Sequence, residues 1–488
     1  MASTNNSISG SVEELREDVP LKRTGAKSYS FWKCLHYRNA DCLTGIGLVY
    51  TVFTTISISV TFLLMLQIYY GAHQILPHGN VVTDNAECSS IGTLILKKGG
   101  NAVDAAVAAT ICMAVVNPHT TGLAAGGIFM TYNHRTRSLP EVIDFGPTIQ
   151  LDTTTLPRLI IGLGFAHRLY GKLPWVVIVR PSVNLARNGF IVQKTLSTAI
   201  EMSRAFDLYG TPQPGQRMEL TTLAYTLEVY SNITADQFEN LLESSNKPSK
   251  EYAINSTFAN YNVYVPNSPT IGPVLLTTLN NIKKYNFTKD DTTKPEYTYR
   301  LAEIILNTYA ELNITKRLYE VTASVVTVTD MQDNYVSIVT GLNGMLGSSH
   351  MSLAGYITDN APVVTGDLET SFMPVIVTDS KFICGKRIIF GTGDASLAVQ
   401  ILSELLIADK NITDSIEASR FRILGEKEIG IEEHFIPNFT EEVMTYLNTI
   451  GNLTSLSEPY DGINSILLLG DNSDVHSDTR TGGLPSQL

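Results

Sequence analysis

Four hydroxyl side chains lie within one ten-residue stretch of the sequence, VTASVVTVTD (residues 321–330). They belong to Thr322, Ser324, Thr327 and Thr329. The stretch alternates and is rich in β-branched residues, so it predicts a strand. A threonine hydroxyl is a nucleophile only when a base takes its proton, and threonine is also a common strand residue. The stretch alone leaves open whether one hydroxyl is catalytic or all four are structural.

The elements around this strand predict a layered α+β body, because helices dominate before it and short strands follow it, with further helices at the flanks. Residues 230–263 are polar and weakly periodic, so we expect loops or a surface excursion there. The expected helices are residues 88–98, 101–116, three within 162–204, 273–283, 296–311 and 396–409. The expected strands, besides the one from residue 321, lie near 335–342, 374–384, 387–393 and 465–470.

A long uncharged segment lies near the N-terminus, since no Asp, Glu, Lys or Arg occurs between Asp41 and His73. A helix of that length crosses a hydrocarbon core of about 30 Å. A cleaved signal peptide is the alternative, but its apolar run is typically only about 7–15 residues and starts nearer the N-terminus. We therefore expect residues 1–41 to be a cytoplasmic tail, 42–72 a transmembrane helix and 73–488 an extracellular domain.

Charge and glycosylation motifs set the expected orientation. Lysines and arginines precede the apolar segment, and none follows it until Lys97, so the N-terminus should be cytosolic and the protein a single-pass type II plasma-membrane protein. Seven N-x-S/T sequons follow the segment and support exposure to the secretory pathway. They begin at Asn232, Asn255, Asn286, Asn313, Asn411, Asn438 and Asn452.

Composition, cysteine count and motifs limit the kinds of partner, disulfide and cofactor that the chain can have. The net charge of -12 argues against a nucleic-acid partner. Palmitoylation of Cys34 or Cys42 beside the membrane is left open. Three further cysteines lie on the oxidising side, which suggests one pair and one odd thiol. The glycine-rich loop near residue 122 has neither GxGxxG nor a P-loop lysine, so it does not predict a phosphate-binding site. We expect no cofactor and no metal.

Two polar residues, one within the expected Ala- and Val-rich helix of residues 101–116 and one just after it, should have structural roles. Asp104 is its one charge and should be a buried acid paired with backbone or with a cation. His119 in NPHTT should be a loop histidine and neither a base nor a ligand, and no second histidine is spaced to form a metal site with it.

Several long motifs closely resemble the γ-glutamyltranspeptidase (glutathione hydrolase) family. The first is GGNAVDAAVAATICMAVVNPHTTGLAAGGIFMTY, and the second is LPRLIIGLGFAHRLYGKLPWVVIVRPSVNLARNGFIV. SPTIGPVLLTTLNNIKKY, LNGMLGS, TSFMPVIV, FGTGDAS and SDTRTGGLP resemble later family blocks in order. The resemblance runs from about Val81 to Pro485.

This resemblance implies an Ntn-hydrolase four-layer αββα sandwich that cuts itself into a large and a small subunit, here about 73–321 and 322–488. The family reaction transfers the γ-glutamyl group of glutathione to the new N-terminal threonine and then to water or an amino acid. The freed α-amine can serve as the base for that threonine. The resemblance also implies a disulfide between Cys88 and Cys112.

At the nucleophile the sequence departs from the family pattern. Counting back from YVSIVTGLN without a gap places Ala323 at the nucleophile position, and Thr322 occupies it only if the turn after Thr329 holds one extra residue. The second active-site threonine is replaced by Gly341, while Asn343 keeps its family spacing. An assembled site would direct the Thr322 hydroxyl toward Asn343 and toward the hydroxyls at positions 370–371.

The positions that hold the glutamyl donor depart further. The arginine that grips the donor carboxylate is replaced by Gly146. In the ammonium-binding motif Asp359 and Asn360 remain, but Ala361 and Val364 replace its other polar positions. Losing both charged contacts should cost on the order of 3–6 kcal/mol of substrate binding.

The remaining donor-side positions are mixed. The carboxylate-binding serine pair becomes Thr370 and Ser371, a conservative change. The glycine pair of the oxyanion hole becomes Asp394 and Ala395, where only backbone N–H groups can serve, and a carboxylate beside a developing oxyanion is unfavourable.

Two functional hypotheses follow. The first is a family enzyme with weak or altered activity on γ-glutamyl compounds such as glutathione, which uses Thr322. The second is a non-catalytic membrane glycoprotein on the same fold that binds a partner or associates with an active family member. A fold does not guarantee its family's chemistry.

Overall fold

This computed structural model describes residues 46–70, 79–146, 156–244, 247–314, 322–360, 370–425, 427–432 and 439–488. The chain divides into two units, residues 1–75 and 76–488, which are described separately. The proposed palmitoylation positions Cys34 and Cys42, together with Asn438, Ala361 and Val364, lie outside the described residues.

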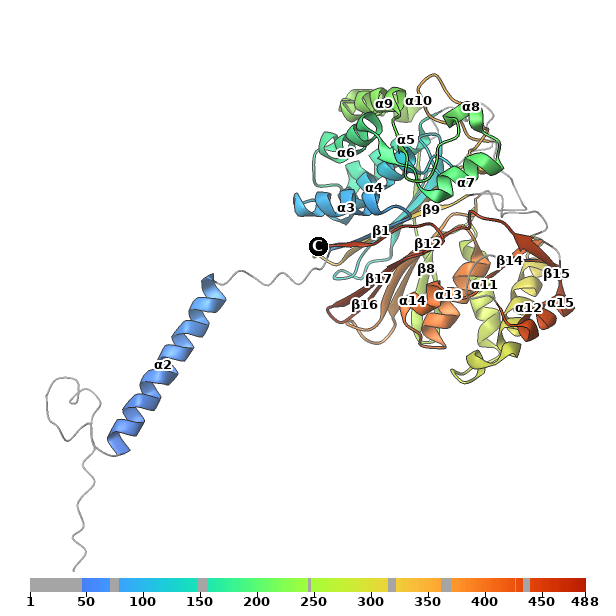
Figure 1. Cartoon of the computed structure of the whole chain (residues 1–488). Coiled ribbons are helices and arrows are strands. Elements are labelled where there is room, and N and C mark those ends of the chain that lie inside the picture. Colours follow the sequence, from blue (N-terminus) through green and yellow to red (C-terminus); the bar gives the residue numbers. More distant parts are fainter. Residues whose placement is uncertain are drawn as a thin grey trace, which may run out of the picture. The chain divides into compact units, whose positions relative to one another are not determined.

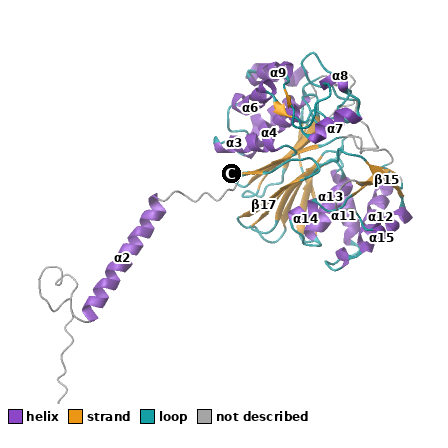
Figure 2. Cartoon of the chain, viewed as in Figure 1, coloured by secondary structure: helices purple, strands orange, loops and turns teal. Residues whose placement is uncertain are grey.

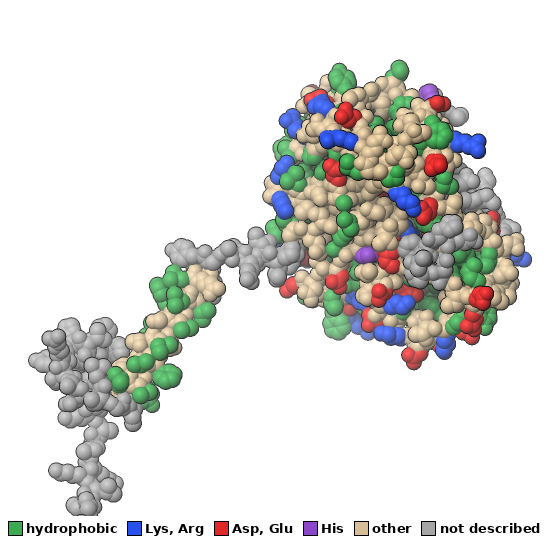
Figure 3. All heavy atoms as spheres, viewed as in Figure 1, with side chains coloured by type: hydrophobic (Ala, Val, Ile, Leu, Met, Phe, Trp, Pro, Cys, Tyr) green, Lys and Arg blue, Asp and Glu red, His purple; other side chains and the backbone are tan. Residues whose placement is uncertain are grey.

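The first unit contributes the helix α2 (Ile46–Tyr70). Its 25 residues extend about 38 Å at 1.5 Å per residue, and its segment Gly47–Gln67 is long and apolar enough to cross a membrane. Figure 3 shows apolar side chains along the helix, with no charged side chain among those drawn in colour. This helix is the candidate membrane anchor of the chain.

The second unit is built around two stacked antiparallel sheets (Figures 1 and 2). The seven-stranded sheet has the order β18 (Ser486–Gln487), β1 (Asn80–Thr83), β9 (Ser324–Thr329), β10 (Asn334–Gly341), β2 (Gly126–Asn133), β3 (Glu141–Asp144) and β6 (Ser249–Tyr252). The six-stranded sheet has the order β17 (Asn472–Ser477), β16 (Asn464–Leu469), β12 (Arg387–Thr392), β11 (Met373–Asp379), β8 (Tyr261–Val265) and β7 (Ile254–Phe258).

An apolar core fills the space between the sheets and is made of inward-facing residues of both, including Val325, Val339 and Ile376. Strands such as β9, β11 and β12 are therefore buried along almost their whole length, as continuous β-branched runs require. Helices cover the outer face of each sheet, which completes the four layers.

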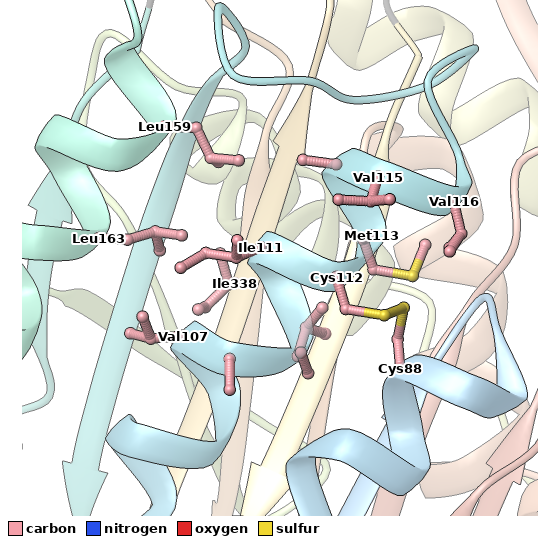
Figure 4. Packing of buried hydrophobic residues seen from close by; sticks show 14 of the residues in the cluster. Cys88, Val107, Ile111, Cys112, Met113, Val115, Val116, Leu159, Leu163 and Ile338 are labelled. Carbon is pink, nitrogen blue, oxygen red and sulfur yellow. A yellow bond between two sulfur atoms is a disulfide. The ribbon is translucent and has the colours of Figure 1, made fainter. Parts of the chain in front are cut away.

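The helices over the seven-stranded sheet are α3 (Ala86–Lys97), α4 (Ala102–Val116), α5 (Arg158–Tyr170), α6 (Trp175–Asn188) and α9 (Thr221–Ser231). All fifteen residues of α4 are buried, because its small side chains let α3, α6, β9 and β10 pack closely around it (Figure 4). Further along this part of the chain are α7 (Lys194–Met202), α8 (Phe206–Tyr209), α10 (Ala235–Ser244) and the short pair β4 (Phe190–Ile191) and β5 (Arg217–Met218).

The six-stranded sheet is covered by α11 (Gly272–Lys283), α12 (Pro295–Glu311) and α13 (Ala395–Leu406), with α14 (Ile412–Ile416) and α15 (Glu441–Ile450) beside them. A small sheet of β13 (Phe421–Gly425), β14 (Glu428–Glu432) and β15 (Asn452–Leu456) flanks this layer.

The prediction of loops for residues 230–263 is wrong. That stretch holds α10, β6, β7 and most of β8, and β8 pairs with β11 in the six-stranded sheet. Val263 is fully buried there. The polar faces of these short strands hid their pairing, because β7 is an edge strand that exposes alternate residues.

Candidate active site

Thr322 lies at the entrance to the buried strand β9, two residues before Ser324, and is half-buried. Its hydroxyl donates to the carbonyl oxygen of Thr120 at 3.0 Å and to that of Leu342 at 3.3 Å. Its backbone N–H also donates to the Leu342 carbonyl, at 3.3 Å. Among the described residues, Thr322 has no hydrogen bond to Asn343, Thr370 or Ser371, so the expected convergence on those groups is not formed.

The alignment that favours Thr322 over Ala323 requires room in the turn after β9. The connection to β10 runs over residues 330–333, and Asp333 has a positive φ of 58°. The carboxylate of Asp330 organises the turn by accepting from the N–H groups of Gln332 and Asn334. The turn therefore holds four residues without disturbing the pairing of β9 with β10.

The loop from Asn117 to Thr121 lies against the same point. The N–H of Leu342 donates to the Thr120 carbonyl at 2.9 Å, and that of Leu346 donates to the His119 carbonyl at 3.0 Å. His119 is buried, and burial lowers the pKa of its imidazole to about 4, so the ring is neutral at pH 7. Its Nδ1 atom has no hydrogen-bond partner among the described residues. His119 is thus a buried loop residue that faces the candidate site.

Gly341 stands where the family resemblance predicts a second active-site threonine, and the structure leaves no room for a side chain at this position. A Cβ built on Gly341 would lie 1.7 Å from the carbonyl oxygen of Thr322. The neighbouring hydroxyl of Thr340 donates to the Gly126 carbonyl at 2.7 Å, within the sheet. No second hydroxyl is supplied to Thr322 from residues 340–341.

Asn343, Asp359 and Asn360 form one buried cluster with Arg158. The Asp359 carboxylate accepts from the backbone and side-chain nitrogens of Asn343 at 2.7 and 2.9 Å and pairs with the Arg158 guanidinium at 2.9 Å. Burial raises the pKa of Asp359, although its hydrogen bonds and Arg158 act in the opposite direction. The side-chain nitrogen of Asn360 donates to the Gly347 carbonyl at 2.8 Å. The carboxylate therefore already has donors and a counterion within the protein.

Thr370 and Ser371 are buried just before β11. The Thr370 hydroxyl accepts from the Phe372 N–H at 3.2 Å. The Ser371 hydroxyl has no hydrogen-bond partner among the described residues. A Cβ on Gly393 would be 3.8 Å from that hydroxyl and 2.9 Å from the Ala323 side chain, so Ser371 faces the strand entrance.

Asp394 caps helix α13 and does not leave an open oxyanion hole. Its carboxylate accepts from the Ser396 N–H at 2.7 Å and pairs with Arg422 at 2.8 Å. Arg422 also pairs with Asp461 at 2.8 Å, and the Asp461 carboxylate in turn accepts from the N–H of Ala323. Burial acts to lower the pKa of Arg422, but the carboxylates of Asp461 and Asp394 outweigh it and raise that pKa. Two ion pairs and one hydrogen bond therefore connect Asp394, at the position where the resemblance predicts an oxyanion hole, to Ala323, the residue after Thr322.

A small chamber of about 40 Å³ lies beside Thr322 and Ala323 and is also lined by Asp84, His119 and Asp461. Burial raises the pKa of Asp84 to about 6, while hydrogen bonds from Ser324 and Asn464 act to lower it. The chamber has room for a few water molecules by the usual volume of a buried water.

Four site residues were not identified from the sequence: Asp84, Arg158, Arg422 and Asp461. What distinguishes these charged residues is that they are largely enclosed by the protein. Only the tertiary structure shows this, because the counter-charge or the hydrogen-bond donors of each residue lie at a distant point of the chain. Gly146, where the family resemblance predicts an arginine, donates its N–H to Asp144 Oδ1 at 2.6 Å.

Three expectations outside the cleft concern the cysteines, Asp104 and the sequon asparagines. Cys88 and Cys112 form a disulfide between α3 and α4 (Figure 4). Cys384 is free and exposed. The Asp104 carboxylate accepts from the N–H groups of Asn101 and Lys172, so its predicted pairing with backbone is confirmed. The six sequon asparagines in the described part of the chain are exposed: Asn232, Asn255, Asn286, Asn313, Asn411 and Asn452.

Two stacked antiparallel sheets between helical layers, with a threonine at the entrance of a central strand, define an Ntn-hydrolase fold. The cephalosporin acylase of Bacillus halodurans has this fold with a TM-score of 0.70, covering 84% of this chain and 96% of that chain at 16% identity. This likeness concerns the fold alone.

Within this fold class, the sequence comparisons indicate a particular family. The γ-glutamyltranspeptidase family model matches residues 88–148 and 145–239. Glutathione hydrolase 7 of Bos taurus is 26% identical and that of Homo sapiens 25% identical, each covering 84% of this chain and 78% of the relative. The glutathione hydrolase 5 proenzyme of Rattus norvegicus is 30% identical over 269 residues, or 44% of this chain and 47% of the relative. These matches, which extend over most of the chain, support the γ-glutamyltranspeptidase family for this protein.

Proposed function

We propose that this protein is a single-pass type II plasma-membrane glycoprotein of the γ-glutamyltranspeptidase family that binds a partner and does not efficiently transfer γ-glutamyl groups. Residues 1–41 form the cytoplasmic tail, 42–72 the membrane segment and 73–488 the extracellular domain. The apolar helix α2, the basic residues before it and the exposed sequon asparagines support this topology.

The observation that carries the proposal is the environment of Thr322. Its hydroxyl donates to two backbone carbonyls, at Thr120 and Leu342, and carbonyl oxygens are too weakly basic to take its proton. The space for a second hydroxyl at position 341 is closed by the Thr322 carbonyl oxygen itself. The nucleophile position is thus held in a structural arrangement.

The donor groups support the same conclusion. The Asp359 carboxylate is bonded to Asn343 and Arg158 and has no free capacity for a substrate ammonium. Asp394 presents a carboxylate where a developing oxyanion would need donors, and that carboxylate is bonded to Arg422. An active family member is the partner that a retained fold with a lost site suggests, through hetero-association of the two extracellular domains.

The second candidate function is a weak γ-glutamyltransferase or glutathione hydrolase acting on glutathione-like compounds through Thr322. It is favoured by the names of the relatives, which are glutathione hydrolases, and by the position of Thr322 at the entrance to β9 beside a small chamber. In that case Thr322 would have to become an N-terminal residue by self-cleavage.

Self-cleavage separates the two functions. The full-length chain, expressed in a secretory host, is deglycosylated, separated on a denaturing gel, and any smaller band is sequenced from its N-terminus. We expect one uncut chain. A small subunit beginning at Thr322 would overturn the non-catalytic proposal and would direct the next assay to γ-glutamyl substrates.

A further inference from the structure

The chain enters the second unit at one end of both stacked sheets. Strand β1 begins at Asn80, which lies opposite Thr329, the last residue of β9. The Ser473 hydroxyl donates to the side-chain oxygen of Asn80 at 3.4 Å, so the turn between β16 and β17 lies at the same end. The loop between β11 and β12 is there too, because Arg387 pairs with Leu468 next to that turn. We call this the entry end, and Thr322 lies at the opposite end of β9.

Three large apolar side chains are exposed together at the entry end. Phe382 and Ile383 lie in the loop between β11 and β12 and are 69% and 58% exposed, and Leu469 at the end of β16 is 53% exposed. The N–H of Gly470 donates to the Cys384 carbonyl oxygen at 3.0 Å, so the two segments are adjacent. Single exposed apolar side chains are common, whereas an adjoining group of them marks an interaction surface. We call the three apolar residues the apolar tip.

The backbone of this loop is fixed by hydrogen bonds on both sides of the tip. The Asp379 carboxylate accepts from the N–H groups of Lys381 and Phe382 at 2.8 and 2.9 Å. The imidazole Nε2 of His134 donates to the Ile383 carbonyl oxygen at 2.8 Å. Folding the tip back onto the sheets would break these bonds. The exposure therefore belongs to the folded loop, which presents the tip already formed to a partner.

The length of the connection to the proposed membrane anchor determines which end of the domain faces the bilayer. Residues 71–78 separate the end of α2 at Tyr70 from Gly79, and eight residues reach no further than about 30 Å. A compact unit of the size of residues 76–488 measures about 55 Å across, from a radius of gyration of about 22 Å. The end of the sheets that carries Thr322 is therefore out of reach of the bilayer, and the entry end is near it.

The charges around the apolar tip are of both signs. Lys381 and Asp471 are exposed, and Arg135 pairs with Asp333 at 2.9 Å. Such a mixed surface gives no strong attraction to anionic lipids, which produce the negative potential of the cytoplasmic leaflet. Phenylalanine enters the boundary between headgroups and acyl chains, while a neighbouring lysine keeps its ammonium in water. The surface therefore fits a zwitterionic phosphatidylcholine leaflet.

We infer that the apolar tip inserts into the outer leaflet of the membrane that holds the anchor, so that the Thr322 end of the domain is turned away from the bilayer. The inference rests on the proposed membrane topology, and it goes beyond that topology because a flexible connection alone leaves the domain free to rotate. It needs no reaction at Thr322, so it is independent of self-cleavage.

A fluorescent label on Cys384 of the full-length protein tests the insertion. Cys34→Ala and Cys42→Ala leave Cys384 as the one cysteine outside the disulfide, so a nitrobenzoxadiazole label reacts there alone. The protein is reconstituted into phosphatidylcholine vesicles with and without nitroxide-labelled phosphatidylcholine. Because a nitroxide quenches only at close range, we expect the label to lose most of its fluorescence. The same label on Leu353→Cys in a Cys384→Ala background should lose little, since Leu353 is fully exposed and follows the end of β10 opposite the entry end.

Substitutions of exposed side chains show whether the tip itself inserts. Phe382→Ser together with Ile383→Ser should abolish most of the quenching at Cys384, while the protein still floats with the vesicles through its anchor. Tyr225→Ser together with Val229→Ser changes another exposed apolar pair, on helix α9, and should leave the quenching unchanged. Equal quenching in the two double variants would overturn the inference.

Two further outcomes would also contradict insertion. Equal quenching of the labels at positions 384 and 353 would show that the tip is not in the leaflet. Blue-shifted emission from Cys384 without quenching by lipid would show that a protein, such as a second copy of this chain, covers the tip. A protein that floats with the vesicles and gives either result retains the proposed anchor and loses only the inference. Failure to float would overturn the topology, and the inference with it.

Discussion

The carbonyl oxygen of Thr322 fills the space into which a side chain at Gly341 would project, because a Cβ there would lie only 1.7 Å from that oxygen. The chain just before β9 thus lies too close to the end of β10 for position 341 to carry a side chain. Glycine at position 341 and the observed path of the chain through Thr322 therefore depend on each other.

Restoring a side chain at position 341 should therefore destabilise the protein and not revive a site. We expect Gly341→Ala to lower the free energy of unfolding by about 3 kcal/mol or more, since backbone atoms must move, and Gly341→Thr to lower it further. Thermal unfolding of the full-length chain in detergent measures this. Gly425→Ala is the control, because a Cβ there meets nothing within 4 Å. Equal effects of the two alanine substitutions would contradict the close approach.

The buried pair of Arg158 and Asp359 should behave as a structural ion pair. Arg158→Met leaves a buried carboxylate without its counterion and should cost about 3–5 kcal/mol of stability, and Asp359→Asn should cost a similar amount. The double variant should be less destabilised than the sum of the two, because it removes both charges. A double-mutant cycle by thermal unfolding measures the coupling.

The exposed pair of Arg135 and Asp333 supplies the control for that cycle. Its side chains are 61% and 37% exposed, and its coupling should not exceed about 1 kcal/mol. Similar coupling in the two pairs would show that Asp359 is solvated, and its carboxylate would then be open to a ligand.

Much of the fold is present in local sequence signals. The Asn101 cap with Asp104 three residues later, followed by twelve mostly apolar and small residues, indicates a buried helix without any tertiary information. The strand at residues 324–329 is equally clear from its β-branched run. Such elements were predicted nearly at their observed bounds.

The strands of residues 249–265 and the ion pairs around the site were not predictable in this way. β8 is short, and its place in the sheet depends on pairing with β11, more than one hundred residues later. From the sequence, Asp394 is an unfavourable substitution at the expected oxyanion hole. In the structure, its carboxylate caps helix α13 and pairs with Arg422. The cap at Ser396 is a local contact, but Arg422 lies 28 residues further along the chain, so no local pattern reports that ion pair.

The disulfide of Cys88 and Cys112 should add substantially to stability. It closes a loop with a sequence separation of 24 residues, which in the chain-entropy model is worth about 3 kcal/mol. Cys88→Ala together with Cys112→Ala should lower the unfolding temperature by several degrees, measured by calorimetry in detergent. Cys384→Ala removes only the free exposed thiol and should change the unfolding temperature little. A similar loss in both variants would indicate that the helices α3 and α4 do not depend on the bond.

The free energy of unfolding of the protein should depend on pH through two residues that line the chamber beside Thr322, and their effects should oppose each other. The pKa of Asp84 is about 6 in the folded state, above its ordinary value of 3.8, so the folded state binds the proton more readily, and stability falls as pH rises from about 4 to about 6. The pKa of His119 is about 4, below its ordinary value of 6.5, so stability increases as pH rises from about 4 to 6.5. Each effect is on the order of 2–3 kcal/mol, and in the parent chain they largely offset each other.

Single substitutions should expose the two slopes. Asp84→Asn removes the fall, so relative to the parent chain this variant should gain stability as pH rises from 4 to 6. His119→Gln removes the opposite term, so relative to the parent chain it should lose stability over the same range. Unfolding temperatures measured at half-unit steps between pH 4 and 7 give both curves, and comparison with the parent chain cancels the titration of groups elsewhere. Parallel curves for the parent and both variants would show that Asp84 and His119 keep their ordinary pKa values and are therefore solvated in the folded protein.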